Sequence, residues 1–264
     1  MELLDIVILG VIQGLTEFLP ISSKGHLLAA RLLFGIDDSG GLAFDAFLHL
    51  GTLAAVLLYY RRVWWGMMRG LVVRDTEGRD KRELLAKLLV ATVPAAAVGY
   101  WFEDVIAVSL RNEHFLSLGF LFTALALWLF DDHSPGSTLT RPRASFKDAL
   151  FIGAAQVLAL LPGVSRSGMT MAAGRARGLT RTQAATFSFL LSAPIIAGAG
   201  LASLSKLTHL VDFTPLQLAI GFGVSFLSGL AAIFMLLKIV ERYSFKPFVG
   251  YLVIIALVVI YASS

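Results

Sequence analysis

Long apolar segments constrain the fold of this chain more than any other feature. Six of them are continuous, at residues 44–60, 84–102, 115–130, 184–204, 214–237 and 247–262. Each approaches the length that a helix needs to cross a hydrocarbon layer about 30 Å thick. Hydrophobic residues make up 57% of the chain and charged residues only 15%. These features predict an all-α polytopic membrane protein with six transmembrane helices, embedded in a lipid bilayer.

Two further apolar segments are interrupted by glycine, proline and serine. Residues 3–34 contain the sequence GLTEFLPISSKGH, from Gly14 to His26, and residues 148–174 contain LLPGVSRSG, from Leu160 to Gly168. Irregular backbone is tolerated at membrane depth only where it is buried in protein or lines a cavity. Each segment is therefore predicted to be a re-entrant hairpin, in which two half-helices meet at a polar turn.

The distribution of lysine and arginine predicts the orientation in the membrane. Sixteen of these residues fall in segments 61–83, 131–147, 175–182 and 238–246, and only two in segments 36–43, 103–114 and 205–213. The positive-inside rule places the first group in the cytoplasm and both termini outside. Residues 61–83 are expected to form a solvated cytoplasmic loop. Because the cations lie in short loops, no nucleic-acid partner is expected.

A weak internal repeat supports opposite insertion of the two hairpins. Shifting the chain by 143 positions aligns eleven identical residues within positions 9–55, against about four expected by chance for such a composition. The matches include Gly10 with Gly153, Gln13 with Gln156, Ser22 with Ser165 and Gly25 with Gly168. They predict one membrane domain, residues 1–264, built of two inverted repeats at about 1–130 and 146–264, joined by the loop 131–147.

The second hairpin carries the residue types that bind phosphate. Arg166 offers a planar guanidinium suited to phosphate oxygens, and it is flanked by Ser165 and Ser167, with Thr170 one turn further on. A half-helix opening near Gly168 would add backbone N–H groups and a favourable dipole. The alternative is that the small residues only allow close helix packing, which would leave the charge of Arg166 unexplained.

The first hairpin carries an acid in place of the arginine. Gln13 and Glu17 are four residues apart and so share one helical face. Glu17 would repel a phosphate unless it is protonated, paired with Arg166 or Lys24, or bound to a divalent cation such as Mg²⁺. A structural salt bridge is the alternative. His49 and Asp45 lie on a neighbouring span as candidate outer contacts.

Ser22, Ser23 and His26 form a candidate nucleophile and base in the turn of the first hairpin. If the second half-helix begins near Lys24, His26 could take the proton of the Ser23 hydroxyl. A serine in such a place often only bonds a nearby carbonyl. Water activated by Glu17 or by a metal would serve equally well as the attacking group, and spacing does not separate these mechanisms.

These motifs closely resemble the two signature regions of the bacterial undecaprenyl pyrophosphate phosphatases, the integral-membrane family linked to bacitracin resistance. The resemblance extends over nearly the whole chain, including SFLLSAPIIAG at 188–198 and ERYSFKPFVGY at 241–251. It implies an enzyme that removes the terminal phosphate of undecaprenyl pyrophosphate and so recycles the lipid carrier for cell-wall synthesis. It also implies a bacterial inner-membrane protein whose active site faces the periplasm, the side on which the positive-inside rule places both termini. A homodimer is a separate expectation.

The resemblance implies roles for individual residues. The catalytic residues would be Glu17, Ser23, His26 and Arg166. Ser165, Ser167 and Thr170 match the family's arginine motif and would bind the substrate. From their places in the two turns, Ser22, Lys24, Gly25 and Gly168 are also expected to bind it. Gln13 and Glu17 would bind Mg²⁺ or Ca²⁺. Lys24 departs from the family, which usually has threonine there, and a lysine could bind phosphate itself or reduce the need for metal.

Two other classes of protein share some of these features. Inverted repeats and broken helices also occur in transporters, so the chain could carry the prenyl phosphate or another anion across the membrane. Phosphate release in detergent, where there is no second compartment, would favour the enzyme. An intramembrane serine protease is a weaker alternative, because it gives Arg166 no role.

Overall fold

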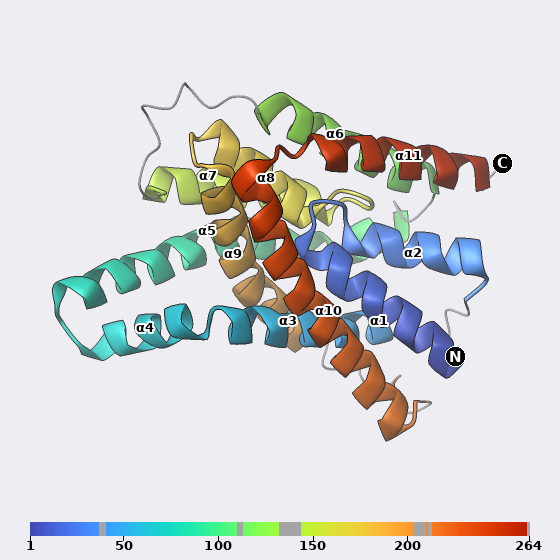
Figure 1. The fold of residues 1–264 in the computed structure, drawn as a ribbon, viewed down its shortest axis with the longest axis horizontal. Coiled ribbons are helices and arrows are strands. Elements are labelled where there is room, and N and C mark those ends of the chain that lie inside the picture. Colours follow the sequence, from blue (N-terminus) through green and yellow to red (C-terminus); the bar gives the residue numbers. More distant parts are fainter. Residues whose placement is uncertain (37–40, 110–112, 132–143, 203–209, 211–212, 263–264) are drawn as a thin grey trace.

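The computed structural model describes residues 1–36, 41–109, 113–131, 144–202, 210 and 213–262 (Figure 1). Within these ranges, all regular secondary structure is helical. The elements are α1 (Leu3–Phe18), α2 (Ser23–Phe34), α3 (Gly41–Tyr59), α4 (Arg61–Val72), α5 (Thr76–Ser109), α6 (Glu113–Asp131), α7 (Phe146–Val157), the 3₁₀ turn η1 (Leu158–Leu160), α8 (Arg166–Ala176), α9 (Arg181–Ala202), α10 (Pro215–Arg242) and α11 (Lys246–Ala262). The predicted all-α class is confirmed.

The long apolar helices identify a multi-pass membrane protein. Four helices, α5, α6, α9 and α10, are long and apolar enough to cross a bilayer, and α3 with α4, which meet at 74°, add a fifth only if the bent pair is counted as one span. The shorter apolar helix α11 follows at the C-terminal end. Each of the six predicted spans coincides with one of these helices, with Pro94 inside α5 and Pro194 inside α9.

The two interrupted segments form helix–turn–helix pairs, as predicted. We call α1 with α2 the first hairpin, and α7, η1 and α8 the second hairpin. A serine caps the second helix in each: the Ser22 side chain accepts a hydrogen bond from the N–H of Gly25, and that of Ser165 from the N–H of Gly168. Such caps satisfy backbone donors that a helix start leaves unpaired. Each turn is thereby tied to the helix that follows it.

The predicted loop at residues 61–83 is wrong. This segment contains α4 and the first turns of α5, which lie side by side as an arm at the left of Figure 1. Val63, Met67 and Gly70 recur at helical spacing and form the inner face of α4, with Met67 and Gly70 buried. The many cations obscured this periodicity, because they occupy the exposed face of the same helix.

Close helix contacts hold the first hairpin in place. The helix α1 crosses α10 (Figure 1), and a Cβ added to Gly14 would lie 2.6 Å from the Ser225 carbonyl oxygen and 2.7 Å from the Gly229 nitrogen. Only glycine therefore fits at this crossing. One turn away, Phe18 meets Phe189 of α9 edge to face, with ring centroids 5.4 Å apart. The C-terminal end of α1 is thus fixed against both α9 and α10.

A buried carboxylate ties together helix ends that lie far apart in sequence. Asp131, 1% exposed at the end of α6, accepts hydrogen bonds from Arg181 Nε at 2.6 Å and from the Phe245 N–H at 2.8 Å. Its backbone oxygen accepts from Arg175 at 2.6 Å. Arg175 and Arg181, which the charge pattern placed at the inner membrane surface, therefore also bind within the protein.

Candidate active site

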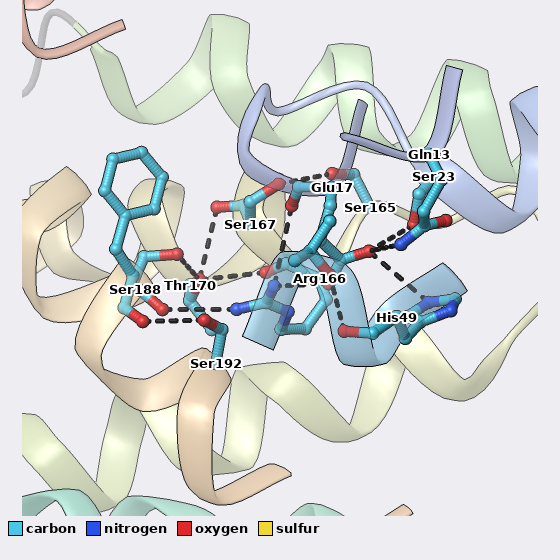
Figure 2. A network of polar contacts seen from close by, with 12 residues as sticks. Gln13, Glu17, Ser23, His49, Ser165, Arg166, Ser167, Thr170, Ser188 and Ser192 are labelled. Atoms are coloured by element: carbon cyan, nitrogen blue, oxygen red, sulfur yellow. Dashed lines mark hydrogen bonds and ion pairs between the residues drawn. The ribbon is translucent and has the colours of Figure 1, made fainter. Parts of the chain in front are cut away.

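The two hairpins meet at Glu17 and Arg166, which are 149 residues apart in sequence (Figure 2). Glu17 lies in the last turn of α1 and is 6% exposed, and Arg166 is the first residue of α8. The guanidinium donates to Glu17 Oε1 at 2.7 Å and, through its other terminal nitrogen, to the Ser188 carbonyl at 3.2 Å. Of the partners considered for Glu17 in the sequence, the structure shows Arg166.

The second oxygen of Glu17 also receives donors. Ser23 Oγ donates to Oε2 at 2.6 Å, and Gln13 Nε2 donates at 3.1 Å from one turn earlier on α1. His49 Nε2 of α3 lies 3.4 Å from the same oxygen. Four side chains from four helices therefore surround one carboxylate, and the predicted outer contact of His49 is a direct one.

Asp45, the other candidate outer contact, lies elsewhere. It binds Arg31 of α2 through two hydrogen bonds, at 2.6 and 3.2 Å. This ion pair joins the end of the first hairpin to the start of α3. Asp45 therefore supports the hairpin and does not itself reach Glu17.

Hydroxyl groups of the second hairpin bind protein atoms around Arg166. Ser167 Oγ donates to the Leu19 carbonyl at 2.8 Å, which makes a further contact between the hairpins, and it lies 3.1 Å from Ser165 Oγ. Thr170 Oγ1 is 2.7 Å from Ser188 Oγ of α9. These side chains are all buried, so the turn that presents Arg166 is rigidly held.

Two glycines allow the hairpins to approach α6. A Cβ on Gly25 would lie 2.6 Å from ring atoms of Phe120, and one on Gly168 would lie 2.6 Å from Cγ2 of Thr123. The predicted substrate-binding glycines therefore have a packing role in this structure. Lys24, between Ser23 and Gly25, is exposed at the start of α2.

His26 has a different environment from the one predicted. Its Nδ1 lies 2.8 Å from the Ser22 carbonyl oxygen and its Nε2 lies 2.8 Å from the Tyr251 hydroxyl of α11. The Ser23 hydroxyl points to Glu17 instead. Sequence reasoning gave no role to Tyr251, which lies 225 residues from His26, or to Ser188. Both lie in segments that resemble the family, 241–251 and 188–198, and that resemblance was the signal that could have found them.

The residues present fit a divalent cation only if the substrate supplies further ligands. Gln13 Oε1 is buried and has no hydrogen-bond partner among the described atoms, and it lies on the residue whose amide binds Glu17. Within the described ranges, no group of three or more His, Cys, Asp or Glu residues could hold a metal ion. Mg²⁺ typically binds one or two carboxylates together with water and phosphate oxygens, and here Glu17 provides one carboxylate and Gln13 an amide oxygen.

Comparison with known proteins identifies the family. Residues 6–258 match the family model described as bacitracin resistance protein BacA. An undecaprenyl-diphosphatase of Desulforudis audaxviator is 43% identical over 258 residues, covering 96% of this chain and 95% of that protein. An undecaprenyl-diphosphatase of Rubrobacter xylanophilus is also 43% identical over 258 residues, with 95% and 94% covered. One from Methanosphaera stadtmanae is 38% identical over 276 residues, with 100% and 99% covered. The resemblance seen in the motifs is confirmed, and the chain belongs to the bacitracin resistance protein BacA family.

Proposed function

We propose that this protein is an undecaprenyl-diphosphatase, which hydrolyses the terminal phosphate of undecaprenyl pyrophosphate to give undecaprenyl phosphate and inorganic phosphate. The family and the names of the relatives support this function. The observation that carries it is the buried contact between Arg166 and Glu17, at 2.7 Å. A guanidinium and a carboxylate with a serine hydroxyl on it, all inside a membrane protein, suit a reaction on the charged end of a lipid.

Arg166 would bind the pyrophosphate together with the start of α8. Arginine forms paired hydrogen bonds with phosphate oxygens, and the free N–H groups of a helix start also favour an anion. Ser165 and Ser167 lie beside Arg166 in the same turn. Lys24, exposed at the start of α2, adds a second cation from the first hairpin. The prenyl chain would extend between helices into the lipid.

Ser23 and Glu17 are arranged for proton transfer. In a covalent route, Glu17 accepts the hydroxyl proton as Ser23 Oγ bonds to the terminal phosphorus, and the bond from that phosphorus to the bridging oxygen breaks. Undecaprenyl phosphate leaves, and water then hydrolyses the phosphoserine. In a direct route, a water molecule deprotonated by Glu17 attacks the same phosphorus. The covalent route starts from the hydrogen bond of 2.6 Å between Ser23 and Glu17. In the direct route the same hydrogen bond orients Glu17.

The Ser23→Ala variant separates the two routes. The covalent route requires that phosphate release be abolished, because no other oxygen takes the place of Ser23 Oγ. The direct route requires that activity survive at a reduced level. The measurement is phosphate release from undecaprenyl pyrophosphate by purified protein in detergent.

A bound Mg²⁺ or Ca²⁺ would be held by Glu17 and Gln13, and it would neutralise charge on the phosphate oxygens. The orphaned amide oxygen of Gln13 supports this assignment. Arg166 and Ser23 already bind the Glu17 carboxylate, so a cation would share that group with them. Titrating the metal during the phosphate-release assay tests the proposal, and full activity in excess chelator would contradict it.

The proposed architecture has six transmembrane helices and two re-entrant hairpins in inverted repeats, at about 1–130 and 146–264. Most of the joining loop, 131–147, lies outside the described residues. We place the protein in the bacterial inner membrane with its termini and active site on the periplasmic side, as the distribution of lysine and arginine favours. The proposed partners are the lipid substrate, the bilayer and a second copy of the chain in a homodimer.

Cysteine labelling can test this topology directly, because the natural sequence has no cysteine. A cysteine at Lys24 is expected to react with an impermeant reagent added to the periplasmic side. Cysteines at Arg69 and Arg242 are expected to react only from the cytoplasmic side. The reverse pattern would contradict the proposed orientation.

The decisive test of function is phosphate release by the wild-type protein in detergent. Release from undecaprenyl pyrophosphate, with loss of activity in Arg166→Ala, is the expected result. Lipid movement in liposomes without phosphate release would instead indicate the transporter that the broken helices also allow.

A further inference from the structure

His26 is clamped between two aromatic side chains from different helices. The ring of Tyr251 in α11 stacks on it, with centroids 5.5 Å apart and planes 11° apart. The ring of Phe120 in α6 meets it at 66°, with centroids 5.3 Å apart. His26 itself is 8% exposed. The imidazole therefore has one orientation, set by residues outside the hairpin.

The hydrogen bonds of His26 determine which nitrogen carries the proton. The Ser22 carbonyl, 2.8 Å from Nδ1, can only accept a hydrogen bond, so Nδ1 is the donor. In a neutral imidazole Nε2 is then an acceptor, and the Tyr251 hydroxyl at 2.8 Å donates to it. A chain of hydrogen bonds thus runs from Tyr251 through His26 to Ser22. Both ring nitrogens are engaged, which explains why Ser23 donates to Glu17 and not to His26.

The end of this chain lies at a strained residue. Ser22 has a φ of 74°, and it is the one non-glycine residue with positive φ in the ranges that the structure describes. Such a conformation is costly for a residue with a Cβ and persists only where surrounding contacts hold it. The Ser22 carbonyl accepts from both the backbone N–H and the Nδ1–H of His26, at 3.1 and 2.8 Å. His26 therefore stabilises the unusual turn.

That carbonyl belongs to the peptide group that joins Ser22 to Ser23. Holding its oxygen fixes the plane of this peptide and the direction from which the Ser23 side chain leaves the backbone. The result is the hydrogen bond of 2.6 Å between Ser23 and Glu17. A change at Tyr251 would be transmitted to this contact without touching either residue.

We propose that Tyr251 is a positioning residue for phosphate release, acting through His26 on the Ser22–Ser23 peptide. This inference rests on the proposed function and adds a helix, α11, to the parts of the molecule that the active site needs. Tyr251 takes no part in bond making, and His26 serves as a neutral link between Tyr251 and the turn.

The first test is the Tyr251→Phe variant, which keeps the stacked ring and removes only the hydroxyl. We expect kcat to fall about tenfold, the effect of losing one part-buried hydrogen bond that orients a reacting group, with KM within about twofold of wild type. Tyr261→Phe is the matched control, since Tyr261 lies on the same helix and is 85% exposed. It should behave as wild type. An unchanged kcat in Tyr251→Phe would overturn the proposal.

A double-mutant cycle shows whether Tyr251 acts through His26. In a His26→Ala background the link is absent, so Tyr251→Phe should cause no further loss of kcat. A further tenfold loss in that background would mean that Tyr251 acts on the substrate directly, and it would overturn the proposal.

Nitrogen NMR of ¹⁵N-histidine-labelled protein gives a readout that needs no activity. The chain has five histidines. Tyr251→Phe should move the Nε2 resonance of His26, because the lone pair loses its donor, and leave the other four histidines in place. An unmoved His26 resonance would overturn the inference. A wild-type protein that releases no phosphate would overturn the proposed function instead, so the two failures are distinguishable.

Discussion

The two hairpins share a backbone design but differ in their polar cores. In the first, Gln13 donates to Glu17, and Glu17 also binds Ser23 and Arg166. In the second, the aligned residue Gln156 is 2% exposed, and neither its amide oxygen nor its nitrogen has a hydrogen-bond partner among the described atoms. Leu160 stands where the first hairpin has Glu17. The turns also differ in backbone, since Ser22 has a φ of 74° where the aligned Ser165 has −81°. Each hairpin supplies only one of the two charged groups, Glu17 before the turn in the first and Arg166 after the turn in the second.

Arg166→Ala should have the largest effect, because it removes the contribution of the second hairpin. We expect phosphate release to fall by about 10³-fold, as for other sites that lose a charge-stabilising donor. It also leaves the buried Glu17 carboxylate without its guanidinium partner, and breaking a buried ion pair destabilises a fold by about 3–5 kcal/mol. Thermal unfolding should accompany the assay.

Arg166→Lys is the control for that loss of stability. It keeps the positive charge but loses the planar fork, so the protein should fold while activity stays well below wild type. Full activity in either variant would show that the second hairpin does not bind the phosphate.

Glu17→Gln tests the contribution of the first hairpin. The amide keeps the shape of the side chain and can still accept from Ser23, but it cannot take a proton. We expect activity to fall by about 10²-fold, within the usual range for losing a general base. Glu2→Gln, at the other end of the same helix, is the matched control and should leave the rate unchanged. Activity near wild type in Glu17→Gln would remove Glu17 from the chemistry.

Gly153→Ala should weaken the packing of the second hairpin against α5 and leave the polar residues of the hairpin unchanged. A Cβ at Gly153 would lie 2.7 Å from the Ala91 Cα and 2.9 Å from its carbonyl carbon in α5. We expect a loss of about 2 kcal/mol in the free energy of unfolding, since backbone atoms cannot move aside cheaply. Gly223→Ala, where a Cβ meets nothing within 4 Å, is the control and should be neutral or slightly stabilising. Equal stability of the two variants would mean that the contact with α5 is not close.

The smallest effect on activity is expected at Gln156, the glutamine of the second hairpin. Gln156→Met should leave activity unchanged and raise stability by up to about 1 kcal/mol, because it replaces a buried amide that makes no hydrogen bond. Gln13→Met should lower activity about tenfold, because it removes a donor from Glu17. The activities of the two variants, measured in one phosphate-release assay, show how far the hairpins have diverged. Equal losses would show that both glutamines serve the reaction.

Much of this arrangement could be predicted from the sequence, because bilayer thickness dictates the length of an apolar helix. The continuous spans and the two interrupted segments were located from hydropathy and from glycine, proline and serine alone. Pairing with Arg166 is one of the alternatives that the sequence leaves open for Glu17, since buried ionisable groups need partners, and the structure shows that contact. These predictions depend on whether each segment is solvated by water or by lipid, and the sequence of one chain is enough to show that.

The parts that could not be predicted depend on contacts across the fold. The sequence predicts a loop where α4 lies, because three arginines fall within its 12 residues. Tyr251 reaches His26 only because α11 packs against α6 and the first hairpin. If the positions of those helices are unknown, a tyrosine in an apolar span that binds another side chain cannot be told from a tyrosine that lies at the membrane surface.

The ion pair between Glu17 and Arg166 has a consequence for selectivity. In the resting protein the guanidinium is already paired with a carboxylate, so a lipid headgroup must compete with that carboxylate to bind it. Most phospholipids around the protein offer at most one negative charge and gain little by the exchange. A diphosphate carries more than one negative charge, so it gains more from binding the guanidinium, and we expect it to displace the resident acid and free it for chemistry.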